Sequence, residues 1–149
     1  MSKIRVLNPT DNTDIFGIIP ALTLNSKLKG IITTVRCPIH LLEGRHHGPN
    51  SGFGVSHIWA EHKNEIIGSG FSSITDVPSY VQKILTTPSL IYFEDRKINR
   101  PRVNAVRIVT GTVILEYVRT KIDNVETPHW SVVTAYSNPR TVGVLVGNI

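Results

Sequence analysis

Two histidines that follow a glycine-rich loop are the side chains of this chain best suited to proton transfer. His57 and His62 lie in the run GFGVSHIWAEHKNEI, which begins with Gly52 and Gly54. Imidazole titrates near neutral pH and can act as a general base or acid. A helix that starts in such a loop offers unpaired N–H groups to an anion. The pattern is compatible with chemistry on a phosphodiester, and equally with a flexible turn before an ordinary amphipathic helix.

The helix expected from Val55 to Ile66 places these two histidines on different faces. At about 100° per residue, its apolar face holds Val55, Ile58, Trp59, His62 and Ile66. His57 lies on the other side with Glu61, whose carboxylate could orient the imidazole. The spacing of His57 and His62 also differs from the i, i+4 spacing of the histidine pair in zinc proteases. The alternative for His62 is a core histidine, and the alternative for His57 is a surface histidine.

A strand near the C-terminus carries a second set of candidate side chains. At a period of two, the residues that share one face are Trp130, Val132, Thr134 and Tyr136. Such a row offers an aromatic stacking surface and hydroxyl donors, which suit a nucleotide. In the preceding strand, Arg119 could project from a face of the sheet. The alternative is a solvent-facing sheet surface without a ligand.

The charge of the chain indicates an acidic partner. The formal net charge is +5 and the isoelectric point is near 9.6, which favours a nucleic acid, an anionic surface or an acidic protein. Basic residues concentrate between residues 96 and 121, where Glu116 is the one acid. They are Arg96, Lys97, Arg100, Arg102, Arg107, Arg119 and Lys121. A solvated basic hairpin would give the same cluster.

Composition excludes several other classes of protein. The single cysteine, Cys37, rules out an internal disulfide and argues against a thiolate metal site. The adjacent His46 and His47 are expected to point to solvent, and a metal site would require ligands that converge in the fold. We expect neither a metal nor a cofactor. No segment is long and apolar enough to span a membrane, and no signal peptide is visible at the N-terminus. At 149 residues the chain is long enough to bury a core of its own.

The order of the expected elements gives the fold class. Residues 1–30 are expected to form an N-terminal arm or leading helix, with helix over 18–28, and residues 31–149 a single domain. Further helices are expected over 55–66 and 76–85. Strands are expected over 31–36, 39–42, 89–94, 103–110, 112–119, 130–137 and 142–146. We therefore expect an α+β fold, with N-terminal helices packed on one face of a four- to five-stranded, mainly antiparallel twisted sheet.

These motifs, in this order, resemble a known family. The stretch EGRHHGPNSGFGVSHIWAEH is followed by a helix and by the strands SLIYFE, GTVILEY and HWSVVTAY. This arrangement resembles the barnase/EndoU/colicin/RelE-like (BECR-fold) ribonuclease toxins, and looks closest to the branch found in polymorphic bacterial toxins and phage proteins. The resemblance covers roughly residues 31–147.

The resemblance implies a metal-independent endoribonuclease, often aimed at transfer RNA. In that chemistry the ribose 2′-OH attacks the adjacent phosphorus and leaves a 2′,3′-cyclic phosphate and a 5′-OH end. The catalytic roles would fall on His57 with His62 as second choice, on Arg119, and on Thr134 and Tyr136. The RNA-binding residues would be Arg102, Arg107, Lys121 and Trp130. His129 is a further possible acid.

The resemblance also implies partners and a place of action. A toxin of this kind is secreted or delivered, acts in the cytoplasm of the target cell, and is neutralised by an acidic immunity protein. No membrane interaction of the folded domain is expected. Two other functions remain open from the sequence: a non-catalytic RNA-binding module and a domain that binds an acidic protein.

Overall fold

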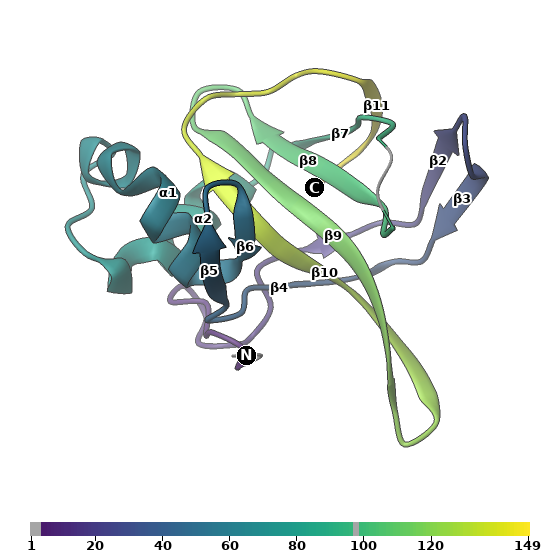
Figure 1. Ribbon diagram of the computed structural model, residues 1–149, viewed down its shortest axis with the longest axis horizontal. Coiled ribbons are helices and arrows are strands. Elements are labelled where there is room, and N and C mark those ends of the chain that lie inside the picture. Colours follow the sequence, from purple (N-terminus) through teal and green to yellow (C-terminus); the bar gives the residue numbers. More distant parts are fainter. Residues whose placement is uncertain (1–3, 97–98) are drawn as a thin grey trace.

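The computed structural model describes residues 4–96 and 99–149 and is built mainly from strands (Figure 1). Lys97 of the basic cluster lies outside this described part. The central sheet has seven strands in the order β1–β4–β10–β9–β8–β7–β11. Their bounds are β1 (Ile18–Ile19), β4 (Cys37–His40), β10 (Val125–Tyr136), β9 (Gly111–Ile122), β8 (Arg102–Arg107), β7 (Leu90–Phe93) and β11 (Val144–Asn148). The pairing of β4 with β10 is parallel, and the other pairings are antiparallel.

Two small hairpins and three helical segments complete the described structure. The hairpins are β2 (Leu22–Ser26) with β3 (Gly30–Thr34), and β5 (Arg45–Gly48) with β6 (Ser51–Phe53). The helical segments are α1 (Gly54–Gly68), the 3₁₀ turn η1 (Ile74–Asp76) and α2 (Val77–Leu85). In Figure 1 the helices gather at one side of the sheet, and the β9–β10 hairpin projects beyond the rest of the chain. None of the helices described has the length and apolar character needed to cross a bilayer.

The expected fold class, with N-terminal helices packed on one face of a four- to five-stranded sheet, is wrong. Strands make up 44% of the structure and helices 19%, and the seven-stranded sheet curls. The helix expected over 18–28 is replaced by β1 and β2. In β2, Leu22, Leu24 and Ser26 are buried and the residues between them are exposed, which is the period of a strand. The first helix of the described chain is therefore α1, after six strands.

Other expected elements are confirmed to within a few residues. Both later helices form, and α2 carries Pro78 in its first turn, where its missing N–H costs no hydrogen bond. The expected loop between β9 and β10 is shorter than predicted. Asp123 and Asn124 turn the chain with φ of 50° and 64°, the pair of positive values that a two-residue hairpin requires.

The curled sheet has an inner face that carries the core and an outer face that carries most of the polar side chains discussed below. Buried inner-face residues include Val103, Ala105, Leu115, Trp130 and Val132. The same core contains Ile58 and Ile66 of α1, Tyr80 and Ile84 of α2, and Phe16, Ile19, Leu22 and Leu24 of the N-terminal segment. The first strands are thus part of one core with the helices and the sheet.

A β-bulge in β10 changes which residues share a face. Val132 pairs with Leu115, but Thr134 pairs with Ile114, so Val133 is the extra residue. Trp130 therefore faces inward, while Thr134 and Tyr136 face outward. The predicted common face of these three residues is wrong. Trp130 is 0% exposed and packs on the ring of Tyr117, with centroids 4.9 Å apart.

Candidate functional site

The glycine-rich loop is a hairpin that folds back against the start of α1. Gly54 has φ +77°, and a Cβ there would lie 2.4 Å from the carbonyl oxygen of Leu42. Glycine is needed here because two backbone segments cross in contact. The N–H groups of Val55 and Ser56 donate to the carbonyls of Leu42 and Glu43, at 3.0 and 2.9 Å. These helix-terminal donors are thus used within the chain and are not open to a phosphate.

His57 lies under this hairpin, in place of the surface position considered from the sequence. Its side chain is buried, with 4% exposure, and its Nδ1 is 3.1 Å from Nδ1 of His46. Burial lowers the pKa of His57, and the nearby carboxylate of Glu61 acts in the opposite direction. Oxygen and nitrogen atoms of His46, His57 and Glu61 converge within 4.8 Å of one another, close enough to hold a metal ion.

His62 lies at a kink in α1 and faces the sheet. Its φ and ψ, −128° and 21°, depart from helical values inside the helix. Its Nδ1 contacts the Glu65 carboxylate, and its ring centroid is 5.5 Å from that of Tyr136. The second oxygen of Glu65 accepts the N–H of Ser137 at 2.9 Å. Glu65 thereby ties His62 to the end of β10, and the His62 side chain remains 23% exposed.

Thr134 and Tyr136 lie on the outer face at the same end of β10. Thr134 Oγ1 is buried and has no hydrogen-bond partner among the residues that the structure describes. Burial raises the pKa of Tyr136, so its hydroxyl holds its proton at neutral pH. We call His62, Glu65, Thr134 and Tyr136 the His62 site. Its geometry places an imidazole, a carboxylate and two hydroxyl-bearing side chains on one outward-facing surface.

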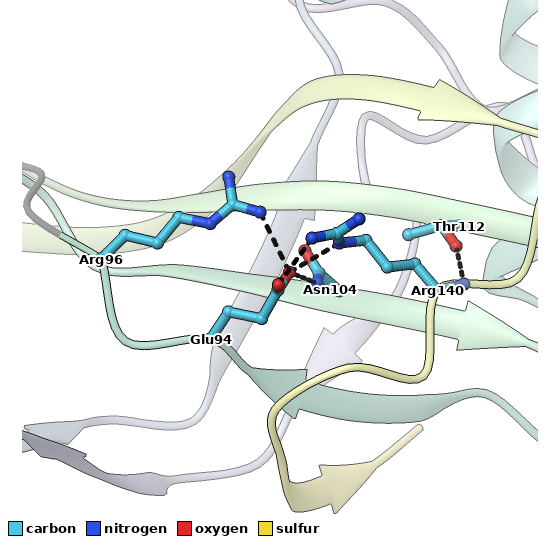
Figure 2. A network of polar contacts seen from close by, with 5 residues as sticks. All are labelled: Glu94, Arg96, Asn104, Thr112 and Arg140. Atoms are coloured by element: carbon cyan, nitrogen blue, oxygen red, sulfur yellow. Dashed lines mark hydrogen bonds and ion pairs between the residues drawn. The ribbon is translucent and has the colours of Figure 1, made fainter.

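A second polar cluster, which we call the Glu94 network, lies on the outer face and is drawn in Figure 2. Glu94 accepts two bonds from Arg140, at 2.7 and 2.8 Å, one from Asn104 at 2.7 Å and one from Arg96 at 3.1 Å. The hydrogen bonds from Arg140 are the main reason why the pKa of Glu94 is lowered to about 2. Arg140 and Glu94 also influence the pKa of Tyr136 electrostatically, which places the network close to the His62 site.

Sequence reasoning missed Arg140. It follows β10 and stands outside the basic cluster of residues 96–121. Its backbone N–H donates to Thr112 Oγ1 at 2.9 Å, as Figure 2 shows. Only the fold, which brings residues 94, 104 and 140 together, identifies its role, and no local signal in the sequence marks it.

A groove of about 550 Å³ runs over the outer face of β8, β9 and β10 and is bordered by the β5–β6 hairpin. Its lining includes Gly52, Phe53, Arg102, Glu116, His129 and Ser131. Arg102 pairs with Glu116 at 2.9 Å. His129 is 8% exposed, and its Nδ1 has no partner among the described residues. Val133, which also lines the groove, directly precedes Thr134 of the His62 site along β10.

Four of the predicted site residues lie apart from this surface. Arg119 pairs with Glu126 at 3.1 Å and lies over the ring of Tyr117 on the opposite face. Arg107 donates to Thr110 at the β8–β9 turn. Lys121 is exposed on the projecting hairpin, and Trp130 is buried in the core. Of the predicted set, the structure brings together His62, Thr134 and Tyr136, with Arg102 in the adjoining groove and His57 earlier on α1.

Comparison with known proteins adds no relative. No protein-family model matches the chain, and neither a curated protein nor a solved structure matches it.

Proposed function

We propose that this protein is a metal-independent endoribonuclease that cleaves RNA by attack of the 2′-OH on the adjacent phosphorus. The observation that carries the proposal is the position of His62, whose Nδ1 is held by Glu65 and whose ring lies against Tyr136. A carboxylate bound to one ring nitrogen fixes the tautomer and leaves the other nitrogen to exchange a proton. His62 is thus the better candidate base than His57, which is buried against His46.

The reaction assigns a role to each group of the His62 site. Nε2 of His62 accepts the proton of the 2′-OH while the 2′ oxygen bonds to phosphorus and the bond to the 5′ oxygen breaks. The proton returns through solvent to the 5′ oxygen, which leaves a 2′,3′-cyclic phosphate and a 5′-OH end. In the proposed reaction Tyr136 and Thr134 donate hydrogen bonds to the phosphate oxygens, whose negative charge grows in the transition state. The Thr134 hydroxyl is buried in the free protein, so it has to become accessible when RNA binds.

The surroundings of the site suit a polyanion. The Glu94 network brings two guanidinium groups and one carboxylate next to Tyr136, an excess of positive charge. The groove adds Arg100 and Arg102, which share Glu116. Together with a net charge of +5, these groups support binding of the RNA backbone along the outer face. The order of motifs that resembles the BECR-fold ribonuclease toxins supports the same activity, with transfer RNA as the expected substrate.

A toxic activity of this kind requires a neutralising partner. We propose an acidic immunity protein that covers the groove and the His62 site, since a basic surface is complementary to an acidic one. We likewise propose that the domain is delivered and acts in the cytoplasm of a target cell. A cognate acidic protein that binds without slowing RNA cleavage would contradict this arrangement.

The test is incubation with total cellular RNA in the presence of EDTA, followed by mapping of the fragment ends. The wild type is expected to give discrete fragments of transfer RNA that carry 2′,3′-cyclic phosphates. H62Q keeps a side chain of similar size but has no basic ring nitrogen, so cleavage should fall by about 10²- to 10⁴-fold. H47A removes an exposed histidine nearby and should leave cleavage unchanged.

Two outcomes would overturn the proposal. If the folded wild type leaves RNA intact but retains it in a salt-sensitive manner, the groove belongs to a non-catalytic RNA-binding module. If H62Q cleaves as fast as the wild type, the base lies elsewhere, and H57Q becomes the next variant to measure.

A further inference from the structure

Three potential metal ligands converge where the β5–β6 hairpin covers α1. His46 comes from β5, and His57 and Glu61 come from successive turns of α1. One atom of each side chain lies within 4.8 Å of the other two. The sequence gives little sign of this group, because the histidine–histidine spacing of eleven residues has meaning only once the hairpin folds back.

The two imidazoles already have the separation that a shared metal ion needs. Their Nδ1 atoms are 3.1 Å apart, with ring centroids at 5.3 Å and an interplanar angle of 27°. Two nitrogens bound to one tetrahedral zinc ion at about 2.0–2.1 Å are roughly 3.3 Å apart. The separation of the two nitrogens is therefore within a few tenths of an ångström of the one that a shared zinc ion requires.

The third ligand is held in place by the hairpin itself. One oxygen of Glu61 accepts the backbone N–H of Asn50, which has a positive φ of 57° in the turn between β5 and β6. A ligand carboxylate that is hydrogen-bonded in this way is a common feature of metal sites.

We propose that His46, His57 and Glu61 bind a divalent transition-metal ion of the zinc class, with solvent in the fourth position. Two imidazoles and one carboxylate suit Zn²⁺, Co²⁺ or Ni²⁺ better than Mg²⁺ or Ca²⁺, which prefer sites built from oxygen alone. The exposed His46 leaves the site open to solvent. A bound ion would link β5 to α1 and fix the hairpin whose Gly52 and Phe53 border the groove.

This inference does not rest on the proposed function, because the proposed base, His62, is not one of the ligands. The test is titration of the untagged, EDTA-stripped and dialysed protein with ZnCl₂ by calorimetry, with Co²⁺ absorption as a probe of coordination geometry. The wild type is expected to bind one ion per chain and to gain thermal stability on binding. H46A and E61A are each expected to lose at least tenfold in affinity, by removal of one ligand.

The matched control is H47A, which removes the exposed histidine next to His46 and leaves the three ligands in place. Its affinity should equal that of the wild type. The proposal fails if the folded wild type binds no Zn²⁺ at micromolar concentration, or if H46A and H47A lose affinity equally. RNA cleavage in EDTA is measured in parallel, so that a failure of metal binding and a failure of the ribonuclease proposal are read separately.

Discussion

The Glu94 network and the His62 site are neighbours on one sheet face but differ in how completely their polar atoms are paired. Both oxygens of Glu94 are hydrogen-bonded, one of them to three donors. Thr112 beside it both donates and accepts. In the His62 site, by contrast, Thr134 Oγ1 is buried without a partner in the described structure.

This difference separates two uses of buried polar groups. A saturated network lowers the free energy of the folded state and fixes the strands that carry it, because each charge keeps its partners. A buried hydroxyl without a partner costs stability, so a position that retains one is a candidate for contact with a ligand. On this basis we propose that the Glu94 network stabilises the fold, and that the His62 site keeps capacity for a substrate. Mutations at matched positions test the division.

The largest effect on stability is expected at Glu94. E94Q keeps the shape of the side chain but removes the charge that Arg140 and Arg96 share. The free energy of unfolding should fall by about 2–3 kcal/mol, measured by urea denaturation, as for a partly buried, multiply bonded carboxylate. The control is E126Q, because Glu126 pairs with Arg119 on the exposed hairpin, where an ion pair contributes about 0.5 kcal/mol or less. Equal losses in the two variants would contradict the structural role of Glu94.

The same carboxylate predicts how stability depends on pH. Its pKa is about 2 in the folded protein, below the usual 4.5, so the folded state binds this proton less readily than the unfolded state. The stabilisation is therefore complete above pH 4.5 and is lost as the pH falls towards 2. Chemical denaturation at pH 2.5, 4 and 6 should show a steeper loss for the wild type than for E94Q. Parallel curves would show that Glu94 does not carry this dependence.

Much of the fold could be predicted where the hydrophobic period is strong and the element is long enough. Helix α2 and the strands from β7 onward follow from such periods. The first strands could not be recognised in this way, because β1 has two residues and β2 five, and a run of that length fits a helix as well. The placement of β1 depends on its pairing with β4, across the intervening β2–β3 hairpin.

The site could be predicted in its residue types but not in its arrangement. A strict period of two would put Trp130, Thr134 and Tyr136 on one face of the strand. The bulge at Val133 moves Trp130 to the opposite face from the other two, and no feature of the sequence indicates the bulge. The burial of His57 depends on a hairpin that folds over it, and the role of Arg140 depends on the meeting of β7, β8 and the segment after β10. These are tertiary effects that local propensity does not contain.

A smaller loss of stability is expected for a change at Thr112, which lies beside the Glu94 network and whose hydroxyl both donates and accepts a hydrogen bond. Its Oγ1 donates to the carbonyl of Asn138 at 2.8 Å and accepts the N–H of Arg140 at 2.9 Å, and the residue is 0% exposed. T112V keeps the volume but leaves both backbone groups without this partner, so we expect a loss of about 1–2 kcal/mol in the free energy of unfolding. A loss below about 0.5 kcal/mol would mean that solvent replaces the hydroxyl readily.

The smallest effect on stability is expected at Thr134, in the adjacent strand and on the same face. T134V is the same chemical change as T112V, but it removes a buried hydroxyl that has no partner in the described structure. The free energy of unfolding should therefore stay within about 0.5 kcal/mol of the wild type or rise slightly. RNA cleavage should nevertheless fall about tenfold, equivalent to about 1.4 kcal/mol of transition-state stabilisation, because the hydroxyl is proposed to contact the phosphate. If T134V instead loses stability as T112V does and cleaves RNA at the wild-type rate, Thr134 is structural, and the contrast between the two clusters does not hold at this position.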